Sequence, residues 1–283
     1  MTLLVQLTDT HIVEPGHRLY NKADTAAHLA DAVAQINAMS PQPDRVMITG
    51  DLVEHPGQET YDHFARLIEP LHAPVNLLPG NHDDPAILRE QFDGTGCFPA
   101  EGPTYQYTIE DLPFRILALN SHYAGSELPA FGPRRLAWLE AALEESDRPT
   151  MIAIHHPPMI TGVEFIDMVG VDWYADIARV IAANSQVRLV ICGHGHTDLV
   201  GTIAHAPVYM AGSIAHQLVA ARGNDHAPGF DNRPVAPVLH HWLGERFVSG
   251  SHPWPAWVDD HRIDTESGLA WTELKDRMRG SMR

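Results

Sequence analysis

Five short polar motifs carry the residue types that bind metal ions in proteins. Each contains a histidine, a carboxylate or an amide, whose nitrogen and oxygen atoms ligate metals. In chain order the motifs are Asp9-Thr10-His11, Gly50-Asp51, Gly80-Asn81-His82-Asp83, His155-His156-Pro157-Pro158 and Gly193-His194-Gly195-His196. If the fold brings them together, their residue types indicate metal-dependent chemistry at one site.

The motifs differ in how specific each is by itself. Asp-x-His arises often by chance, and Gly-Asp after a strand is commonly a plain turn. Gly80-Asn81-His82-Asp83 is more specific, because Asn and His directly after a buried strand serve no packing purpose. Gly193-His194-Gly195-His196 is the most specific, since it places two imidazoles at i and i+2 in a glycine-rich loop. The prediction rests on the occurrence of all five in this order.

Apolar runs typical of β-strands precede the motifs, and amphipathic segments separate these runs. The predicted strands are Leu3–Leu7, Arg45–Thr49, Val75–Leu78, Phe114–Leu119, Thr150–Ile154 and Val187–Cys192. The predicted helices are Thr25–Met39, Glu59–Ile68, Pro133–Glu145 and Asp172–Ala183. Alternation of strand and helix in the first half favours parallel strands with helices packed outside. Ligands bind at the carboxyl ends of strands in such sheets, so we expect the motifs to converge there.

The second half adds hairpins and a less regular end. Three hairpins are predicted: Thr104–Ile109 with Phe114–Leu119, Leu199–Ala204 with Val208–Ala211, and Val238–Leu243 with Arg246–Ser251. Between Arg222 and Pro237 the composition shifts to Gly, Pro, Asn and Asp, and we expect regular structure to lapse there. The tail carries Trp254, Trp257 and Trp271, which suit packing or a subunit contact, and a homo-oligomer is expected.

Composition excludes several classes of partner. The 283 residues include 36 acidic and 19 basic ones, for a net charge of −17, which disfavours nucleic acids and anionic membranes. No run reaches the length of about 18 apolar residues of a membrane span. Two cysteines make no disulfide framework, and the N-terminal residues carry no basic leader. A small-molecule substrate and a cytoplasmic location are therefore expected.

The order Asp-x-His, Gly-Asp, Gly-Asn-His-Asp, His and Gly-His-x-His resembles the signature of calcineurin-like metallophosphoesterases. The resemblance runs from about Leu3 to about Gln217. Within that superfamily, Gly-Asn-His-Asp together with His-His-Pro-Pro is similar to class III cyclic-nucleotide phosphodiesterases and bacterial glycerophosphodiesterases. The resemblance implies a metallophosphoesterase domain over residues 1–217 and a C-terminal extension over residues 218–283, packed on the same domain or at a subunit interface.

The resemblance also implies a role for each motif residue. It places Asp9, His11 and His196 on a first metal ion, Asn81, His155 and His194 on a second, and Asp51 on both. His82 stands beside the phosphoryl group as the catalytic residue, and His156 is a bystander. His216, Tyr20 and Asn21 are candidate substrate contacts, with loop packing as the alternative. The ligand types suit Fe, Mn, Zn or Co, and the second site, which shares its one carboxylate, should be the weaker.

The fold implied is an α/β four-layer α-β-β-α sandwich with a C-terminal hairpin and tail. The function implied is hydrolysis of small phosphodiesters, either 3′,5′-cyclic nucleotides or glycerophosphodiesters, by a hydroxide held between two metal ions about 3.5–4 Å apart. The alternative is a phosphomonoesterase, including a protein phosphatase. A DNA exonuclease fits poorly with an acidic chain, and a non-catalytic scaffold fits poorly with a full set of ligands.

Overall fold

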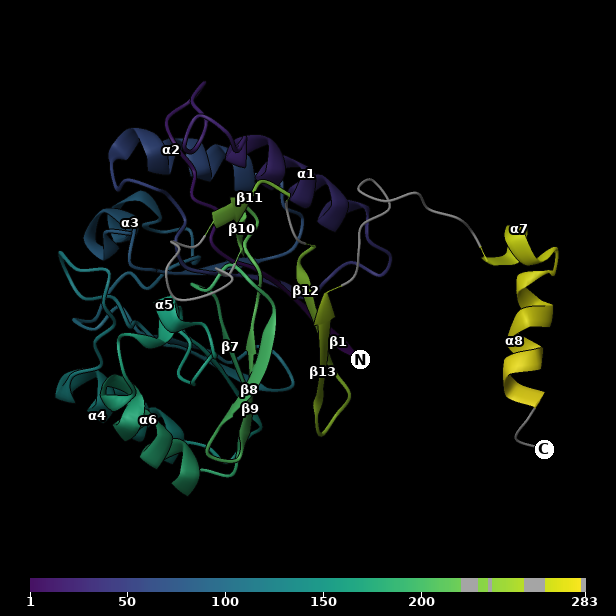
Figure 1. Cartoon of the computed structure of the whole chain (residues 1–283). Coiled ribbons are helices and arrows are strands. Elements are labelled where there is room, and N and C mark those ends of the chain that lie inside the picture. Colours follow the sequence, from purple (N-terminus) through teal and green to yellow (C-terminus); the bar gives the residue numbers. More distant parts are fainter. Residues whose placement is uncertain (220–228, 234–235, 252–262, 281–283) are drawn as a thin grey trace. The chain divides into compact units, whose positions relative to one another are not determined.

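The computed structural model describes residues 1–219, 229–233, 236–251 and 263–280. The chain divides into two compact units, Met1–His252 and Pro253–Arg283. The larger unit contains two sheets packed face to face, with helices on the outer face of each (Figure 1). The expected four-layer sandwich is therefore confirmed.

The first sheet has five strands in the order β13-β12-β1-β2-β3. Their bounds are Phe247–Ser251 (β13), Val238–Trp242 (β12), Thr2–Leu7 (β1), Arg45–Thr49 (β2) and Val75–Leu78 (β3). β1, β2 and β3 run parallel, as the alternation with helices predicts. β12 pairs antiparallel with β1, and β13 pairs antiparallel with β12.

The second sheet has six strands in the order β4-β5-β6-β7-β9-β8. Their bounds are Tyr107–Ile109 (β4), Arg115–Ala118 (β5), Thr150–Ala153 (β6), Val187–Cys192 (β7), Ala206–Met210 (β9) and Leu199–Ile203 (β8). β5, β6, β7 and β9 are parallel, and the edge strands β4 and β8 are antiparallel to their neighbours. A buried cluster that includes Leu4, Met47, Ile116 and Met151 fills the space between the two sheets.

Helices cover the outer faces of both sheets (Figure 1). Their bounds are Thr25–Ala38 (α1), Gln58–Ile68 (α2), Pro85–Gln91 (α3), Pro133–Glu144 (α4), Glu164–Asp167 (α5) and Asp172–Ala183 (α6). Asp24 and Asp84 cap α1 and α3 by accepting hydrogen bonds from backbone N–H groups of the first turn. Leu139, Leu143, Ile177 and similar side chains of α4 and α6 pack on the second sheet.

The C-terminal hairpin β12-β13 is part of the first sheet, because β12 supplies the backbone partners of β1. The division into a domain over residues 1–217 and an extension over residues 218–283 stays a prediction. One detail differs from the sequence expectation. A short strand β11, Gly229–Asp231, lies inside the stretch expected to be irregular and pairs with β10, Gln217–Val219. Neither pairing can be predicted from the local sequence. β12 and β1 are distant in the chain, and β11 lies in a stretch rich in turn-forming residues.

The smaller unit contains α7, Ile263–Ser267, and α8, Trp271–Gly280. Trp271 is 53% exposed, and the Lys275 Nζ lies 5.6 Å from the centre of its ring. Trp254 and Trp257 lie outside the described residues, and the proposed role of the tail in a subunit contact stays a prediction. No helix in the described part of the chain is long and apolar enough to cross a membrane.

Candidate metal centre

The loops after β1, β2, β3, β6 and β7 meet at one edge of the two sheets. Backbone hydrogen bonds fasten these loops together: the N–H of Asp9 donates to the Gly50 carbonyl at 3.0 Å, and the N–H of Gly193 donates to the His155 carbonyl at 2.9 Å. The predicted convergence of the five motifs is therefore present, and it joins loops from both sheets.

Five of the candidate ligands have left-handed backbone conformations, which residues other than glycine rarely adopt. The φ angles are +51° for Asp9, +41° for His11, +49° for Asp51, +70° for His194 and +47° for His196. Such conformations cost about 1–3 kcal/mol each and persist where the surrounding structure imposes them. The packed sheets thus hold these side chains in an arrangement that the isolated loops would not keep.

Two glycines allow the loops to approach closely. A Cβ at Gly80 would overlap the Asp51 carboxylate, and a Cβ at Gly193 would overlap the Thr8 hydroxyl and lie 2.5 Å from Asp9 Oδ2. Glycine is therefore required at both positions for steric reasons.

The first cluster of donor atoms comes from Asp9, His11, Asp51 and His196, which lie close enough to hold one metal ion. His196 Nε2 lies 3.2 Å from Asp9 Oδ1 and 3.1 Å from His11 Nε2. His11 Nε2 lies 3.6 Å from Asp51 Oδ2. This cluster contains the same four residues that the sequence predicts for the first metal.

The second cluster comes from Asn81, His155 and His194, again with Asp51. Asn81 Oδ1 lies 3.1 Å from His155 Nε2 and 2.9 Å from His194 Nδ1. His155 Nε2 lies 3.3 Å from Asp51 Oδ2, the same oxygen that faces His11. Asp51 Oδ2 therefore lies between the two clusters, and Asp51 is the residue that would contribute to both metal sites.

Hydrogen bonds to the opposite ring nitrogens orient the histidines. His155 Nδ1 donates to the backbone carbonyl of Thr49 (2.8 Å), and His196 Nδ1 donates to the backbone carbonyl of His216 (3.0 Å). Such contacts fix the tautomer that leaves the other nitrogen free for a metal.

Glu54 makes the corresponding contact to His11, with its Oε2 2.7 Å from His11 Nδ1. Sequence reasoning missed Glu54. It lies three residues after Asp51, and its only local signal is a carboxylate close to a candidate ligand.

The two buried carboxylates are ionised. Burial opposes this, but the charge of His196 beside Asp9 and that of His155 beside Asp51 hold the pKa of each carboxylate below its usual range. Burial would lower the pKa of His155, yet Asp51 raises it to about 9. Burial and the charge of His155 lower the pKa of His194 to about 4. A metal ion binds neutral imidazole, so its binding at His155 would release a proton.

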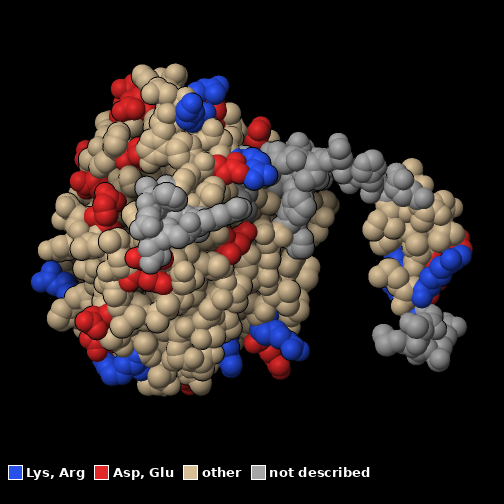
Figure 2. Space-filling model, viewed as in Figure 1, with Lys and Arg blue, Asp and Glu red and all other residues tan. Residues whose placement is uncertain are grey.

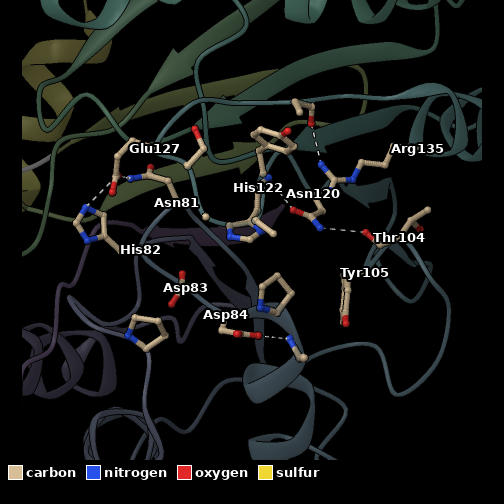
Figure 3. A pocket seen from close by; sticks show the side chains of 18 of the residues that line it. Asn81, His82, Asp83, Asp84, Thr104, Tyr105, Asn120, His122, Glu127 and Arg135 are labelled. Atoms are coloured by element: carbon tan, nitrogen blue, oxygen red, sulfur yellow. Dashed lines mark hydrogen bonds and ion pairs between the residues drawn. The ribbon is translucent and has the colours of Figure 1, made fainter.

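His82 lies beside the clusters, and one of its ring nitrogens is hydrogen-bonded to the protein backbone. Its Nδ1 donates to the Glu54 carbonyl (2.9 Å), and its Nε2 lies 3.6 Å from Glu127 Oε2. Burial lowers the pKa of His82, but the charges of Asp51, Glu54 and Glu127 outweigh it and raise the pKa above its ordinary value. Glu127, which sequence reasoning also missed, accepts a hydrogen bond from the Asn81 side-chain amide (Figure 3).

Asp83, the last residue of its motif, fastens two of the loops to each other. Its Oδ2 accepts from the backbone N–H groups of Gly80 (2.9 Å) and Leu52 (3.1 Å), and its Oδ1 accepts from the Tyr61 hydroxyl (3.0 Å). Burial and the charge of Asp51 raise its pKa to about 7.

His156 is buried beside His155 and His194, close enough to share a metal ion with them. Both of its nitrogens also have protein partners, with Nδ1 2.8 Å from the Ser121 hydroxyl and Nε2 3.3 Å from the Glu127 carbonyl. Burial holds its pKa well below the usual range. These contacts are compatible with the bystander role, which stays a prediction.

A cavity of about 660 Å³ opens over both clusters. We call it the metal-facing cavity; beyond the clusters its wall is largely apolar and includes Tyr20, Leu128, Phe165, Met168, His216 and Phe230. Tyr20, His216 and Phe230 contact one another, with ring centres 5.3–5.8 Å apart. Of the three candidate substrate contacts, Tyr20 and His216 line this cavity. Asn21 is exposed and is not among the described residues that line it.

The donor set fits two transition-metal ions. Each cluster combines imidazole nitrogens with carboxylate or amide oxygens, which suits Fe, Mn, Zn and Co alike. Paired sites of this kind, with one shared carboxylate at the loop-bearing edge of a double sheet, define the class of binuclear metallohydrolases.

Comparison with known proteins gives the family. The family model for calcineurin-like phosphoesterases matches residues 2–198. A probable glycerophosphodiester phosphodiesterase, GpdQ, of Arcobacter nitrofigilis is 32% identical over 249 residues, which cover 86% of this chain and 90% of the relative. A probable cyclic nucleotide phosphodiesterase of Rhodopseudomonas palustris is also 32% identical, with 81% and 85% of the two chains covered.

The fold agrees with these relatives. A dimetal phosphatase from Danio rerio superposes with a TM-score of 0.62 over 89% of this chain and 99% of that protein, at 16% identity. The chain belongs to the calcineurin-like phosphoesterase family. The family and the enzyme class expected from the motifs, a metal-dependent phosphoric diester hydrolase, are thereby confirmed.

Proposed function

We propose that this chain hydrolyses small acyclic phosphodiesters of the glycerophosphodiester type. The observation that carries the proposal is the position of Asp51 Oδ2, 3.6 Å from His11 Nε2 and 3.3 Å from His155 Nε2, between two complete donor clusters. The similarity to GpdQ, which extends over 90% of that relative, supports the glycerol-bearing class of substrate.

In this proposal Asp9, His11 and His196 hold the first metal ion, Asn81, His155 and His194 hold the second, and Asp51 holds both. When bound, the metal pair supplies a water-derived nucleophile near neutral pH and positive charge that offsets the charge of the phosphate. Two divalent ions with the two ionised carboxylates Asp9 and Asp51 would give the ligand set itself a net positive charge, although the chain carries −17. Fe, Mn, Zn and Co all suit the donors.

The role of His82 follows from its two ring nitrogens. Because Nδ1 donates to the Glu54 carbonyl, Nε2 is the nitrogen that can carry a proton to the substrate. Its raised pKa favours the protonated ring near neutral pH. We assign to Nε2 the transfer of that proton to the departing alkoxide, so that water and a diester give a monoester and an alcohol.

The residues of this chain also position the substrate. The ion-pair contacts of His82 with Glu54 and Glu127 hold its ring beside the donor clusters, where the phosphoryl group would bind. His216 and Tyr20, as proposed substrate contacts, would pack against the ester substituent that occupies this cavity.

Hydrolysis of 3′,5′-cyclic nucleotides is the second candidate function. The contact of Tyr20, His216 and Phe230 over the metal-facing cavity favours it, because aromatic rings stack on a nucleobase. The similarity to the relative from Rhodopseudomonas palustris points in the same direction.

The test is turnover by protein reconstituted with manganese. We expect hydrolysis of bis(p-nitrophenyl) phosphate, and higher kcat/KM on glycerophosphocholine and glycerophosphoethanolamine than on cyclic AMP and cyclic GMP. Absence of diester hydrolysis with every metal would refute the proposal and leave the scaffold interpretation. Faster hydrolysis of p-nitrophenyl phosphate than of the diester would favour the phosphomonoesterase alternative.

We further propose a cytoplasmic location and a homo-oligomer. The two cysteines, Cys97 and Cys192, are both free, as is usual in a reducing compartment. Acidic side chains are spread over the visible face of the larger unit, in keeping with the net charge of −17 and with a substrate other than nucleic acid (Figure 2). Light scattering on the full chain tests the oligomer, and a monomeric mass would refute it.

A further inference from the structure

A second cavity adjoins the metal-facing one. It measures about 1060 Å³, and we call it the polar cavity. Asn81, His82 and Glu127 line both cavities, so the two meet at the residues beside the clusters (Figure 3). A phosphoryl group at the metal centre would therefore have the metal-facing cavity on one side and the polar cavity on the other.

The polar cavity has a wall different from that of the metal-facing one. It is formed by the segment 81–86 after β3, by residues 103–105 and by the long loop after β5 that leads into α4. The side chains labelled in Figure 3 include Asp84, Tyr105, His122 and Arg135. Aromatic, acidic and basic groups thus surround a space that Phe165, Met168 and Phe230 do not reach.

His122 is the residue of this cavity whose side chain is most available for a hydrogen bond to a bound molecule. Its side chain lines the cavity, and the residue is only 9% exposed. Its backbone N–H donates to Asn120 Oδ1 at 2.8 Å, but within the described part of the chain its ring nitrogens have no hydrogen-bond partner. The ring nitrogens of His122 are not among the buried unpartnered atoms of the described residues, so they are open to the cavity, where the neutral ring offers a bound molecule one donor and one acceptor. Burial and the neighbouring Arg135 lower its pKa, which keeps the ring neutral.

Arg135 adds further hydrogen-bond donors to the wall of this cavity. Its Nη1 donates to the Ala130 carbonyl at 2.8 Å, and among the described residues its guanidinium forms no ion pair. The wall also contains the acidic side chains of Glu54, Asp83, Asp84 and Glu127 and the basic side chain of Arg134, so it offers both donors and acceptors. Hydroxyl groups, which donate and accept at once, are the chemistry that such a wall recognises.

We propose that the polar cavity is a subsite for a hydroxyl-bearing ester arm, such as a glycerol or other polyol, and that His122 hydrogen-bonds to its hydroxyls. This inference rests on the proposed diesterase function. It assigns one arm of the diester to the polar cavity and the other to the metal-facing cavity. A cyclic 3′,5′-diester joins both of its ester oxygens to one sugar and cannot extend into two cavities in this way, whereas an acyclic diester can.

The test compares two substrates that differ only in hydroxyl groups: glycerophosphocholine and n-propyl phosphocholine. Wild-type protein should prefer the glycerol ester, and His122→Leu should lower kcat/KM for it about tenfold through KM, the effect of one or two lost hydrogen bonds. For n-propyl phosphocholine the same substitution should change kcat/KM much less. An equal fall for both substrates, or no change in their ratio, would overturn the proposal.

Two further variants separate the subsite from general damage. His122→Gln keeps one donor and one acceptor and should recover part of the preference for the glycerol ester. His72→Leu removes an exposed histidine before β3, at the opposite end of the strand from the metal-binding loops, and should leave both substrates unaffected. Melting temperature and metal content are measured for each variant.

A binding measurement keeps the subsite testable if no diester is hydrolysed. Titration of glycerol 3-phosphate into the metal-loaded protein, followed by calorimetry, should show about tenfold weaker binding to His122→Leu than to wild type. Equal affinities would refute the subsite. Weaker binding without turnover of any diester would instead retain the subsite and refute the proposed function.

Discussion

A fully buried histidine makes protein stability depend on pH. His240, on β12, is fully buried; its Nε2 lies 3.0 Å from Gln6 Oε1 and its Nδ1 lies 2.7 Å from the Ser249 hydroxyl. Gln6 in turn donates to Thr49 Oγ1 and to the Cys192 carbonyl, both at 2.9 Å. An amide oxygen only accepts, so Nε2 carries the proton and Nδ1 accepts from the serine. The neutral ring is fully hydrogen-bonded.

Burial, and then the charge of His241, lowers the pKa of His240 from 6.5 to about 3. Below pH 6.5 the unfolded chain therefore binds a proton that the folded chain does not, and stability falls as pH falls. At pH 5, about 1.5 pH units below the ordinary value, the expected loss is about 2 kcal/mol relative to pH 8, since each pH unit within this range contributes about 1.4 kcal/mol.

The assay is urea unfolding at pH 8 and pH 5, in a chelator that keeps every sample free of metal. His240→Gln removes the titrating group, so the variant should lose about 2 kcal/mol less than wild type between the two pH values. The matched control His72→Gln, at an exposed site, should lose as much as wild type. If His240→Gln and wild type lose stability equally, the buried neutral state assigned to His240 is wrong.

Three further substitutions test the metal centre. His82→Ala should lower kcat about 100-fold or more while metal content stays constant, and a parallel loss of metal would assign His82 to binding instead. Asn81→Asp should tighten the second metal site about tenfold in a metal titration, because it adds a carboxylate; unchanged affinity would contradict the ranking of the two sites. Glu54→Gln should weaken the first site about 10-fold in a chelator competition, since the charge that faces His11 Nδ1 is lost. The exposed Glu59→Gln serves as its control, and equal metal affinity in the two variants would show that Glu54 has no such role.

The sequence by itself determined the strands of the two large sheets, the helices α1, α2, α4 and α6, and the class of chemistry. Val187–Cys192 and Asp172–Ala183 have the predicted bounds because local apolar patterns decide them. The helices α3, α5, α7 and α8 were missed. For α3 and α5 the reason is their length, since elements of 7 and 4 residues carry too little periodicity to detect. The motif residues were predictable because ligand types at strand ends are a local feature.

Only the tertiary structure decided how those residues act together. Asn81 meets His194 across 113 residues of chain, and His155 meets Thr49 across 106, so no local pattern encodes these contacts. The position of Asp51 between two clusters, the support of His11 by Glu54, and the pairing of β12 with β1 depend on how the two sheets dock. The polar cavity likewise exists only because the loop after β5 folds over the segment after β3. Docking of this kind minimises the free energy of the whole core, and that sum over distant contacts is absent from any short stretch of sequence.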